Sequence, residues 1–218
     1  MNIPNCISVL RIVLIPLFLY LILLPQIETK IWALIIFCIA SFTDLLDGWT
    51  ARRLGQETAT GKFLDPIADK FLVISALIAF LILDKFIPLW MVLIIVGRDI
   101  LITYMRYLAI KKKSVLKTSR FGKIKTVFQM ISIIIIIMVF IIRSSGVAPP
   151  DSIKGSYPEI NSVFDIYMSD HPDKWLIITP YFLMAIVTLL TAFSGIRYII
   201  TNRSLLIPDD LIKSNKKN

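Results

Sequence analysis

The sequence predicts an all-α integral membrane protein with about six transmembrane helices. Hydrophobic residues make up 56% of the 218 residues and charged residues only 18%, whereas soluble domains have about 45–50% apolar and about 25% charged residues. The apolar residues form six long segments, and a membrane-spanning helix requires about 20 residues. The formal net charge of +9 indicates, in so apolar a chain, basic loops beside anionic lipids rather than nucleic-acid binding.

The first three apolar segments cover residues 6–24, 31–49 and 64–83. No Lys or Arg precedes the first segment and no small-residue cleavage site follows it, so we expect a permanent span rather than a signal peptide. The second segment begins with the run IWALIIFCIASF and carries Asp44 and Asp47 in its second half. Cys6 in the first segment and Cys38 in the second are predicted to be small core residues.

The last three apolar segments cover residues 87–110, 127–142 and 175–200. Lys and Arg dominate the stretches after segments two, four and six, whereas residues 143–174 hold five acidic and three basic side chains. The positive-inside rule then places both termini and the tail 201–218 in the cytoplasm and the loop 143–174 outside. We therefore predict one membrane-embedded domain over residues 1–218, a multi-pass protein of the inner (cytoplasmic) membrane whose active site faces the cytoplasm.

Four aspartates lie on helix faces of the second and third segments, beside small residues. Residues three or four apart share a helix face. Two segments joined by a short loop are expected to be antiparallel neighbours, so their acidic ends meet at the cytoplasmic side. The first face holds Asp44, Asp47, Gly48, Ala51 and Arg52, and the second holds Gly61, Asp65 and Asp69.

Four carboxylates in a membrane protein are costly unless they are paired, protonated or bound to a metal. A divalent cation relieves their repulsion, and hard oxygen ligands favour Mg²⁺ or Mn²⁺ over zinc. His171 is the only histidine, which argues against a His–metal cluster or a Ser–His pair. The alternative is that the acids form ion pairs with Arg52, Arg53 or Lys70 and that the small residues serve helix packing.

The pattern Asp44-x2-Asp47-Gly48-x2-Ala51-Arg52-x8-Gly61-x3-Asp65-x3-Asp69 resembles the signature of the CDP-alcohol phosphatidyltransferase family at every fixed position. The resemblance implies that family's six-helix fold and an enzyme that displaces CMP from a CDP-linked lipid. It implies that the four aspartates hold a pair of divalent ions, which stabilise the attacking and leaving oxygens, and that Asp69 is also the general base. The residues expected to contact the CDP-lipid are Gly48, Ala51, Arg52, Thr58, Gly61, Asn5 and Ser8.

Other segments resemble the bacterial branch of this family that forms phosphatidylglycerophosphate. They are residues 2–11, 51–54, 61–70, 97–106, 122–130 and 190–198, and that branch usually has Glu where Asp99 stands. We therefore predict transfer of the phosphatidyl group from CDP-diacylglycerol to sn-glycerol 3-phosphate. The phosphate of the acceptor is expected to contact basic residues of segments four and five, namely Arg98, Arg106, Lys123 and Lys125. Asp99 is expected to orient an Arg or to accept a hydrogen bond from a substrate hydroxyl.

Several alternatives stay open at this point. Arg106, Lys123 and Lys125 have an alternative role as snorkelling side chains that contact lipid headgroups. Within the family, the acceptor is alternatively phosphatidylglycerol, as in a cardiolipin synthase, or an inositol phosphate. A divalent-cation or proton transporter would also use four acids, although the chain shows no internal repeat of the kind expected there. A non-catalytic lipid-binding scaffold is a further alternative, and the family resemblance also suggests a homodimer.

Overall fold

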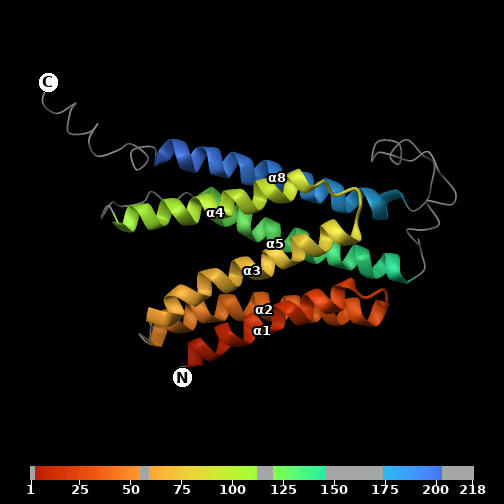
Figure 1. The fold of residues 1–218 in the computed structure, drawn as a ribbon, viewed down its shortest axis with the longest axis horizontal. Helices are drawn as coiled ribbons and strands as arrows, with labels where there is room; N and C mark the ends of the chain where they lie inside the picture. Colours follow the sequence, from red (N-terminus) through yellow and green to blue (C-terminus); the bar gives the residue numbers. More distant parts are fainter. Residues whose placement is uncertain (1–2, 55–58, 112–119, 146–173, 203–218) are drawn as a thin grey trace, which may run out of the picture. The chain divides into compact units, whose positions relative to one another are not determined.

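The structure, a computed structural model, describes residues 3–54, 59–111, 120–145 and 174–202. Within these ranges it does not describe the side chains of residues 3–9, 44–54, 59–69, 106, 110–111, 120–121 and 123. The regular elements of the described ranges are all α-helices, which confirms the predicted helical class (Figure 1). They are α1 (Ile3–Leu23), α2 (Ile27–Leu54), α3 (Ala59–Leu83), α4 (Leu89–Lys111), α5 (Arg120–Ser144) and α8 (Lys174–Thr201).

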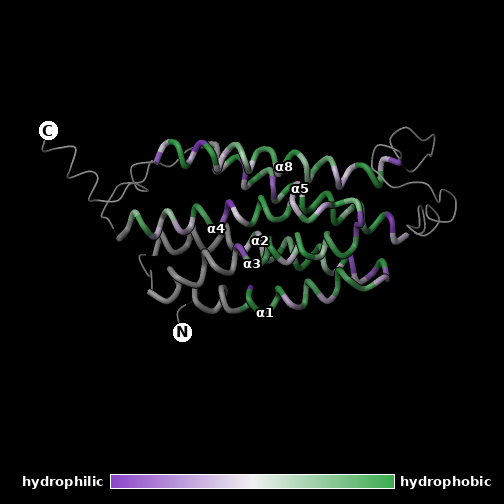
Figure 2. The backbone as a smooth tube through the Cα atoms, turned by 45° about the horizontal axis from the view of Figure 1, so that its top comes forward, coloured by the Kyte–Doolittle hydropathy of each residue, from purple (hydrophilic) through white to green (hydrophobic). Residues whose placement is uncertain are grey.

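Two helical stretches of the described residues are long and apolar enough to cross a membrane, namely Ile124–Ser144 and Lys174–Thr201. Leu10–Leu23 and Lys70–Leu83 are shorter apolar stretches. Figure 2 shows that most of α5 and α8 is hydrophobic, with isolated hydrophilic positions. Large apolar side chains on α8 are exposed at helical spacing: Leu189, Phe193, Ile196 and Ile200. An exposed apolar face of this kind suits lipid rather than water, so these helices indicate a membrane-associated protein.

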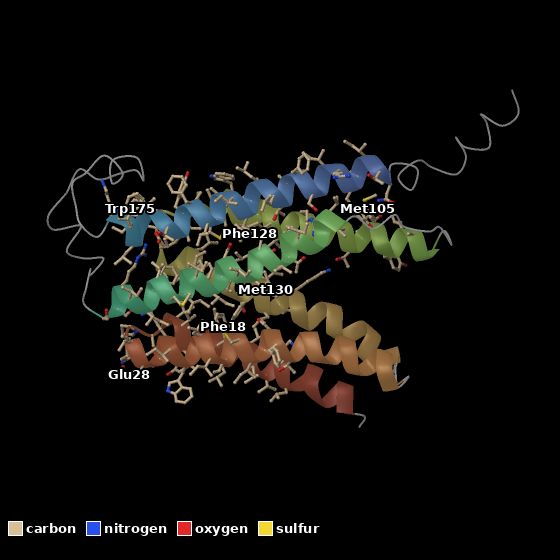
Figure 3. The ribbon with its side chains drawn as sticks, turned by 180° about the vertical axis from the view of Figure 1, so that it is seen from behind. Phe18, Glu28, Met105, Phe128, Met130 and Trp175 are labelled. Carbon is tan, nitrogen blue, oxygen red and sulfur yellow. The ribbon has the colours of Figure 1, made fainter. Side chains whose placement is uncertain are left out.

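The chain forms two compact units, which we describe separately. Unit 1 comprises Met1–Leu89 and Met130–Met184, and unit 2 comprises Trp90–Gln129 and Ala185–Asn218. In unit 1, α1 packs against α2 and α3, and α2 also contacts α3. Fully buried aromatic side chains join the helices: Phe18 of α1, which Figure 3 labels, lies against Phe37 of α2, with ring centroids 5.6 Å apart. The acidic segments of α2 and α3 therefore belong to one packed group of helices.

The turn between α1 and α2 is closed by Lys30. Its Nζ donates to the carbonyl oxygens of Leu24 and Pro25 at 3.0 and 3.3 Å. Both carbonyls lie in the turn after α1, so the ammonium links this turn to the first turn of α2. Burial lowers the pKa of Lys30, which lies just before the second predicted span.

A buried ion pair, which we call the Arg143 network, joins three helix ends of unit 1. Arg143 in the last turn of α5 donates from Nη1 to Asp84 Oδ2 at 2.9 Å. Its Nε and Nη2 donate to the backbone carbonyl of Leu176 in α8, at 3.0 and 2.7 Å. The second carboxylate oxygen of Asp84 accepts from the Phe86 backbone N–H at 3.0 Å. Asp84 is 3% exposed, so the network is almost fully removed from solvent.

Pro180 explains why Arg143 bonds to this particular carbonyl. In a regular helix the carbonyl of Leu176 would accept from the backbone N–H of residue 180, but α8 has Pro180 there, and proline has no N–H. The guanidinium supplies two donors in place of the missing one. Arg143 and Lys174, the two ends of the predicted loop, are thus helical, and residues 146–173 lie outside the described part of the chain.

The prediction that Cys38 is a core residue is wrong. Its thiol is exposed, on a face of α2 that also exposes Ile31, Ile35, Ile39 and Phe42. A uniformly apolar run does not indicate which face points inward, because lipid accepts apolar side chains as readily as the protein core does. The side chain of Cys6 lies outside the described residues.

Candidate functional site

Unit 2 contains a second, partly buried group of charges, which we call the basic cluster: Arg98 and Asp99 of α4 and Lys125 of α5. Arg98 Nη1 donates to Asp99 Oδ1 at 2.8 Å. Lys125 Nζ donates to the same oxygen at 3.2 Å. The structure thus brings together three of the five residues predicted to bind the acceptor.

Ser194 and Gly195 of α8 contact the Arg98 side chain. Arg98 Nη2 donates to Ser194 Oγ at 2.8 Å, and Ser194 is 8% exposed. A Cβ atom at Gly195 would lie 3.0 Å from Arg98 Cγ, closer than ordinary van der Waals contact. Glycine at position 195 therefore lets α8 approach the aliphatic part of the arginine, while Ser194 holds its guanidinium.

The basic cluster contains two cations and one carboxylate. Two cations share one carboxylate oxygen, so the three residues together have a formal charge of +1. The Lys125 side chain is only 4% exposed and that of Arg98 only 14%, so water screens their repulsion weakly. Lys125 is therefore buried rather than extended toward lipid headgroups, the alternative role considered for it. Arginine and lysine both bind phosphate through charge-assisted hydrogen bonds.

A stripe of buried polar residues on α8 accompanies the cluster. Thr188, Thr191 and Ser194 are at most 8% exposed and recur at three-residue steps, so they share one helix face. Asn202 at the helix end is also buried. Sequence reasoning missed this stripe as part of the site, although polar residues at helical spacing inside an apolar helix were a signal that could have revealed it.

The acidic segments predicted to bind metal lie on α2 and α3. The α2 helix continues to Leu54 and α3 begins at Ala59, so both aspartate pairs lie in helical backbone, and α2 contacts α3. The donor set consists of carboxylates, which fits Mg²⁺ or Mn²⁺. The side chains of Asp44, Asp47, Asp65 and Asp69 lie outside the described residues. Among the side chains that are described, no three His, Cys, Asp or Glu residues form a group that could hold a metal.

The other predicted residues occupy several helices, and their side chains are likewise not described. Arg106 is on α4 and Lys123 on α5, the two helices that contribute the basic cluster. Thr58 lies outside the described residues altogether. The residues predicted to contact the CDP-lipid from helices are Asn5 and Ser8 on α1, Gly48, Ala51 and Arg52 on α2, and Gly61 on α3.

Comparison with known proteins gives consistent matches. Residues 1–153 match the family model for CDP-alcohol phosphatidyltransferase. Three similar proteins carry the name CDP-diacylglycerol–glycerol-3-phosphate 3-phosphatidyltransferase. The one from Wigglesworthia glossinidia brevipalpis is 39% identical over 138 residues, covering 61% of this chain and 75% of its own. Those from Bacillus subtilis (strain 168) and Escherichia coli (strain K12) are 40% and 38% identical over 144 and 137 residues, each covering 61% of this chain and 74% of their own. The family match includes the basic cluster and ends before Ser194.

Proposed function

Because the chain belongs to the CDP-alcohol phosphatidyltransferase family, we propose that it transfers the phosphatidyl group of CDP-diacylglycerol to sn-glycerol 3-phosphate. The products are phosphatidylglycerophosphate and CMP, a step of phospholipid biosynthesis. The names of the similar proteins contain the same two substrates. The structural observation that carries the acceptor assignment is the basic cluster, which brings Arg98 and Lys125, two cations suited to phosphate, to one carboxylate oxygen.

The acceptor differs from an uncharged alcohol by its dianionic phosphate, and the basic cluster is suited to that group. Arg98 presents a planar fork of N–H donors, which matches two phosphate oxygens better than a lysine does. Lys125 adds a point charge from the neighbouring helix. Asp99 holds both cations through one oxygen, so it positions them and limits their repulsion before the phosphate arrives. In this proposal, Arg106 and Lys123 add further positive charge on the same two helices.

The chemistry takes place at the four aspartates. Asp69 accepts the proton of the C1 hydroxyl of glycerol 3-phosphate. The hydroxyl oxygen then forms a bond to the phosphorus that bears diacylglycerol, the bond from that phosphorus to the CMP oxygen breaks, and CMP leaves with the electron pair. Asp44, Asp47, Asp65 and Asp69 would hold Mg²⁺ or Mn²⁺, with two ions expected. The bound metal would neutralise pyrophosphate charge, as in other two-metal phosphoryl-transfer sites.

The CDP-lipid would occupy the small-residue faces beside these acids. Gly48, Ala51 and Gly61 leave room for the ligand near the helix backbone, and Arg52 would bind a phosphate of the pyrophosphate. Thr58, Asn5 and Ser8 would add hydroxyl and amide contacts. The spacing of these positions on α1, α2 and α3 supports the assignment, because the three helices pack together in unit 1.

The direct test is CMP release by the purified protein, with CDP-diacylglycerol and a panel of acceptors. We expect turnover with glycerol 3-phosphate and little with phosphatidylglycerol or inositol phosphate. Asp69→Asn should abolish turnover without loss of folded protein, and chelation with EDTA should stop the reaction until Mg²⁺ or Mn²⁺ is restored. Turnover with phosphatidylglycerol alone would overturn the acceptor assignment. Full activity after complete chelation would remove the metal from the proposal.

The proposal includes a single domain over residues 1–218 with six spans in the cytoplasmic membrane. Both termini and the tail 201–218 lie in the cytoplasm, residues 143–174 lie outside, and two copies form a homodimer. Charge asymmetry supports this orientation. Single cysteines at Ser114 and Ser152, with Cys6 and Cys38 replaced, should react with an impermeant label from opposite sides. Labelling of both from outside would contradict the six-span topology, and subunit counting in lipid vesicles would test the dimer.

A further inference from the structure

Two buried polar side chains lie one helical turn from the basic cluster and lack hydrogen-bond partners within the described structure. They are Gln129 of α5, through Nε2, and Thr191 of α8, through Oγ1. Gln129 is 3% exposed and Thr191 is 0% exposed. Buried donors and acceptors in native proteins nearly always have partners, so each exception calls for a physical explanation. A polar ligand that completes them is one such explanation.

Helical register places both groups next to the cluster. Gln129 follows Lys125 by four residues on α5, between Phe128 and Met130, which Figure 3 labels. Thr191 precedes Ser194 by three residues on α8. Residues at these spacings share a helix face. Both faces meet at the basic cluster, because Lys125 bonds to Asp99 and Ser194 accepts from Arg98.

Gln129 and Thr191 are displaced from the cluster in the same direction. Within unit 2, α5 and α8 run in opposite senses (Figure 1), so a step forward along α5 and a step backward along α8 have the same direction. The displacements along the helix axes are about 6 Å for four residues and about 4.5 Å for three. A three-carbon alcohol whose phosphate lies on Arg98 and Lys125 extends its hydroxyl groups over about this range.

We infer that Gln129 and Thr191 recognise the secondary hydroxyl of the acceptor, and so select a glycerol phosphate over acceptors that lack that group. This inference rests on the proposed function, since it assigns a specificity role within the same acceptor site. The Gln129 amide donates to the hydroxyl oxygen, and the Thr191 hydroxyl completes the pair as donor or acceptor. Neither residue touches the reacting C1 oxygen. Their contribution is therefore selection of the acceptor rather than catalysis of the transfer.

The test uses an acceptor that lacks only this hydroxyl. 3-Hydroxypropyl phosphate keeps the phosphate and the primary hydroxyl, and differs from glycerol 3-phosphate at the middle carbon alone. With wild-type protein and CDP-diacylglycerol, we expect kcat/KM from CMP release to favour glycerol 3-phosphate by roughly tenfold or more, because losing a hydrogen bond to buried groups leaves them unpaired. Thr191→Val and Gln129→Met keep the side-chain volumes. They should lower kcat/KM for glycerol 3-phosphate about tenfold and leave that for 3-hydroxypropyl phosphate within a few-fold.

Two controls distinguish recognition from packing. Thr191→Ser keeps a hydroxyl and should retain the preference. Thr126→Val, at an exposed threonine of the same α5 helix, should not change it. Equal losses on both acceptors, or a wild-type protein that does not distinguish them, would overturn the inference. If the wild-type protein does not turn over glycerol 3-phosphate at all, the proposed function fails first. A variant that does not fold would be identified by its melting temperature and by its KM for CDP-diacylglycerol.

Discussion

The Arg143 network and the basic cluster contain the same types of residue but differ in the number of cations that share one carboxylate. Each contains an arginine of a helix and an aspartate, in an apolar protein. In the Arg143 network one cation meets one carboxylate, and the remaining guanidinium donors bond to a backbone carbonyl. In the basic cluster two cations meet one carboxylate, and Arg98 Nε has no partner within the described part of the chain.

This difference distinguishes a structural ion pair from the proposed acceptor site. A buried ion pair is tolerated when its charges balance and its donors and acceptors are satisfied, and the Arg143 network meets both conditions. In the proposed function the basic cluster receives an anion, the phosphate of the acceptor, whereas the Arg143 network has a purely structural role. Replacement of the arginine by leucine should consequently affect mainly stability in the Arg143 network and mainly function in the basic cluster.

The largest effect is expected from Arg143→Leu. Removing one partner of a buried pair leaves an uncompensated charge on Asp84 and typically costs about 3–5 kcal/mol of folding stability. We expect a strongly lowered melting temperature in detergent, while the surviving folded protein keeps its KM for glycerol 3-phosphate. Arg197→Leu, at an exposed arginine, is the matched control and should change stability by at most about 1 kcal/mol, because the interactions of exposed cations are weak. An unchanged melting temperature for Arg143→Leu would show that the network does not hold the fold.

Arg98→Leu should affect function more than stability. Loss of one charge-assisted hydrogen bond costs about 1.5–3 kcal/mol, and each 1.4 kcal/mol is about a tenfold change in affinity. The KM for glycerol 3-phosphate should rise roughly ten- to a hundredfold, while that for CDP-diacylglycerol changes much less. Steady-state CMP release with each substrate varied in turn measures both constants. Impaired use of CDP-diacylglycerol with an unchanged acceptor KM would place the acceptor site elsewhere.

A double-mutant cycle sharpens the structural side of the comparison. Pro180→Ala supplies the backbone N–H that the Leu176 carbonyl lacks, so Arg143 is needed less in that background. Residues that share a partner couple by about 0.5–3 kcal/mol, and we expect Arg143→Leu to cost about 1 kcal/mol less in the alanine background. Denaturant or thermal unfolding of the four proteins measures this coupling. Strictly additive effects would show that the guanidinium does not replace the missing N–H.

The smallest effect is expected from Asp99→Glu. The longer side chain keeps the negative charge that holds Arg98 and Lys125, so the acceptor KM should change only a few-fold. Asp99→Asn keeps the size and removes the charge, and should raise that KM more. Kinetics of the two variants under identical conditions provide the comparison. Equal damage by both would mean that exact side-chain length, rather than charge, positions the two cations.

The sequence predicted helix positions well because long apolar runs are local features. It also placed Arg98, Asp99 and Lys125 in one site, since helix faces and loop charges indicated a common end of the helices. It did not predict Ser194 as the partner of Arg98, which lies 96 positions away along the chain, or Asp84 as the partner of Arg143, 59 positions away. Such pairs depend on how helices pack, and neither hydropathy nor helical spacing contains that information.

Arg143 illustrates the limit most clearly. In the sequence it follows an apolar run and looked like an ordinary charge in a loop. Only the packing of α8 shows that its guanidinium replaces the backbone N–H that Pro180 lacks. Pro180 inside an apolar helix was a signal for this, because a proline there leaves one carbonyl without its usual donor. The metal and CDP-lipid predictions depend on side chains outside the described residues, and they stay predictions.

Pro180 also constrains the order in which this part of the chain can diverge over evolutionary time. Loss of Arg143 first would strand both the Leu176 carbonyl and the Asp84 carboxylate in an intermediate sequence. Replacement of the proline first removes the carbonyl defect, because residue 180 then supplies the backbone N–H. Loss of either Arg143 or Asp84 alone would still leave the other as an uncompensated buried charge. Among descendants of this sequence, the proline should therefore be able to change first, and the arginine and the aspartate should be kept or lost together.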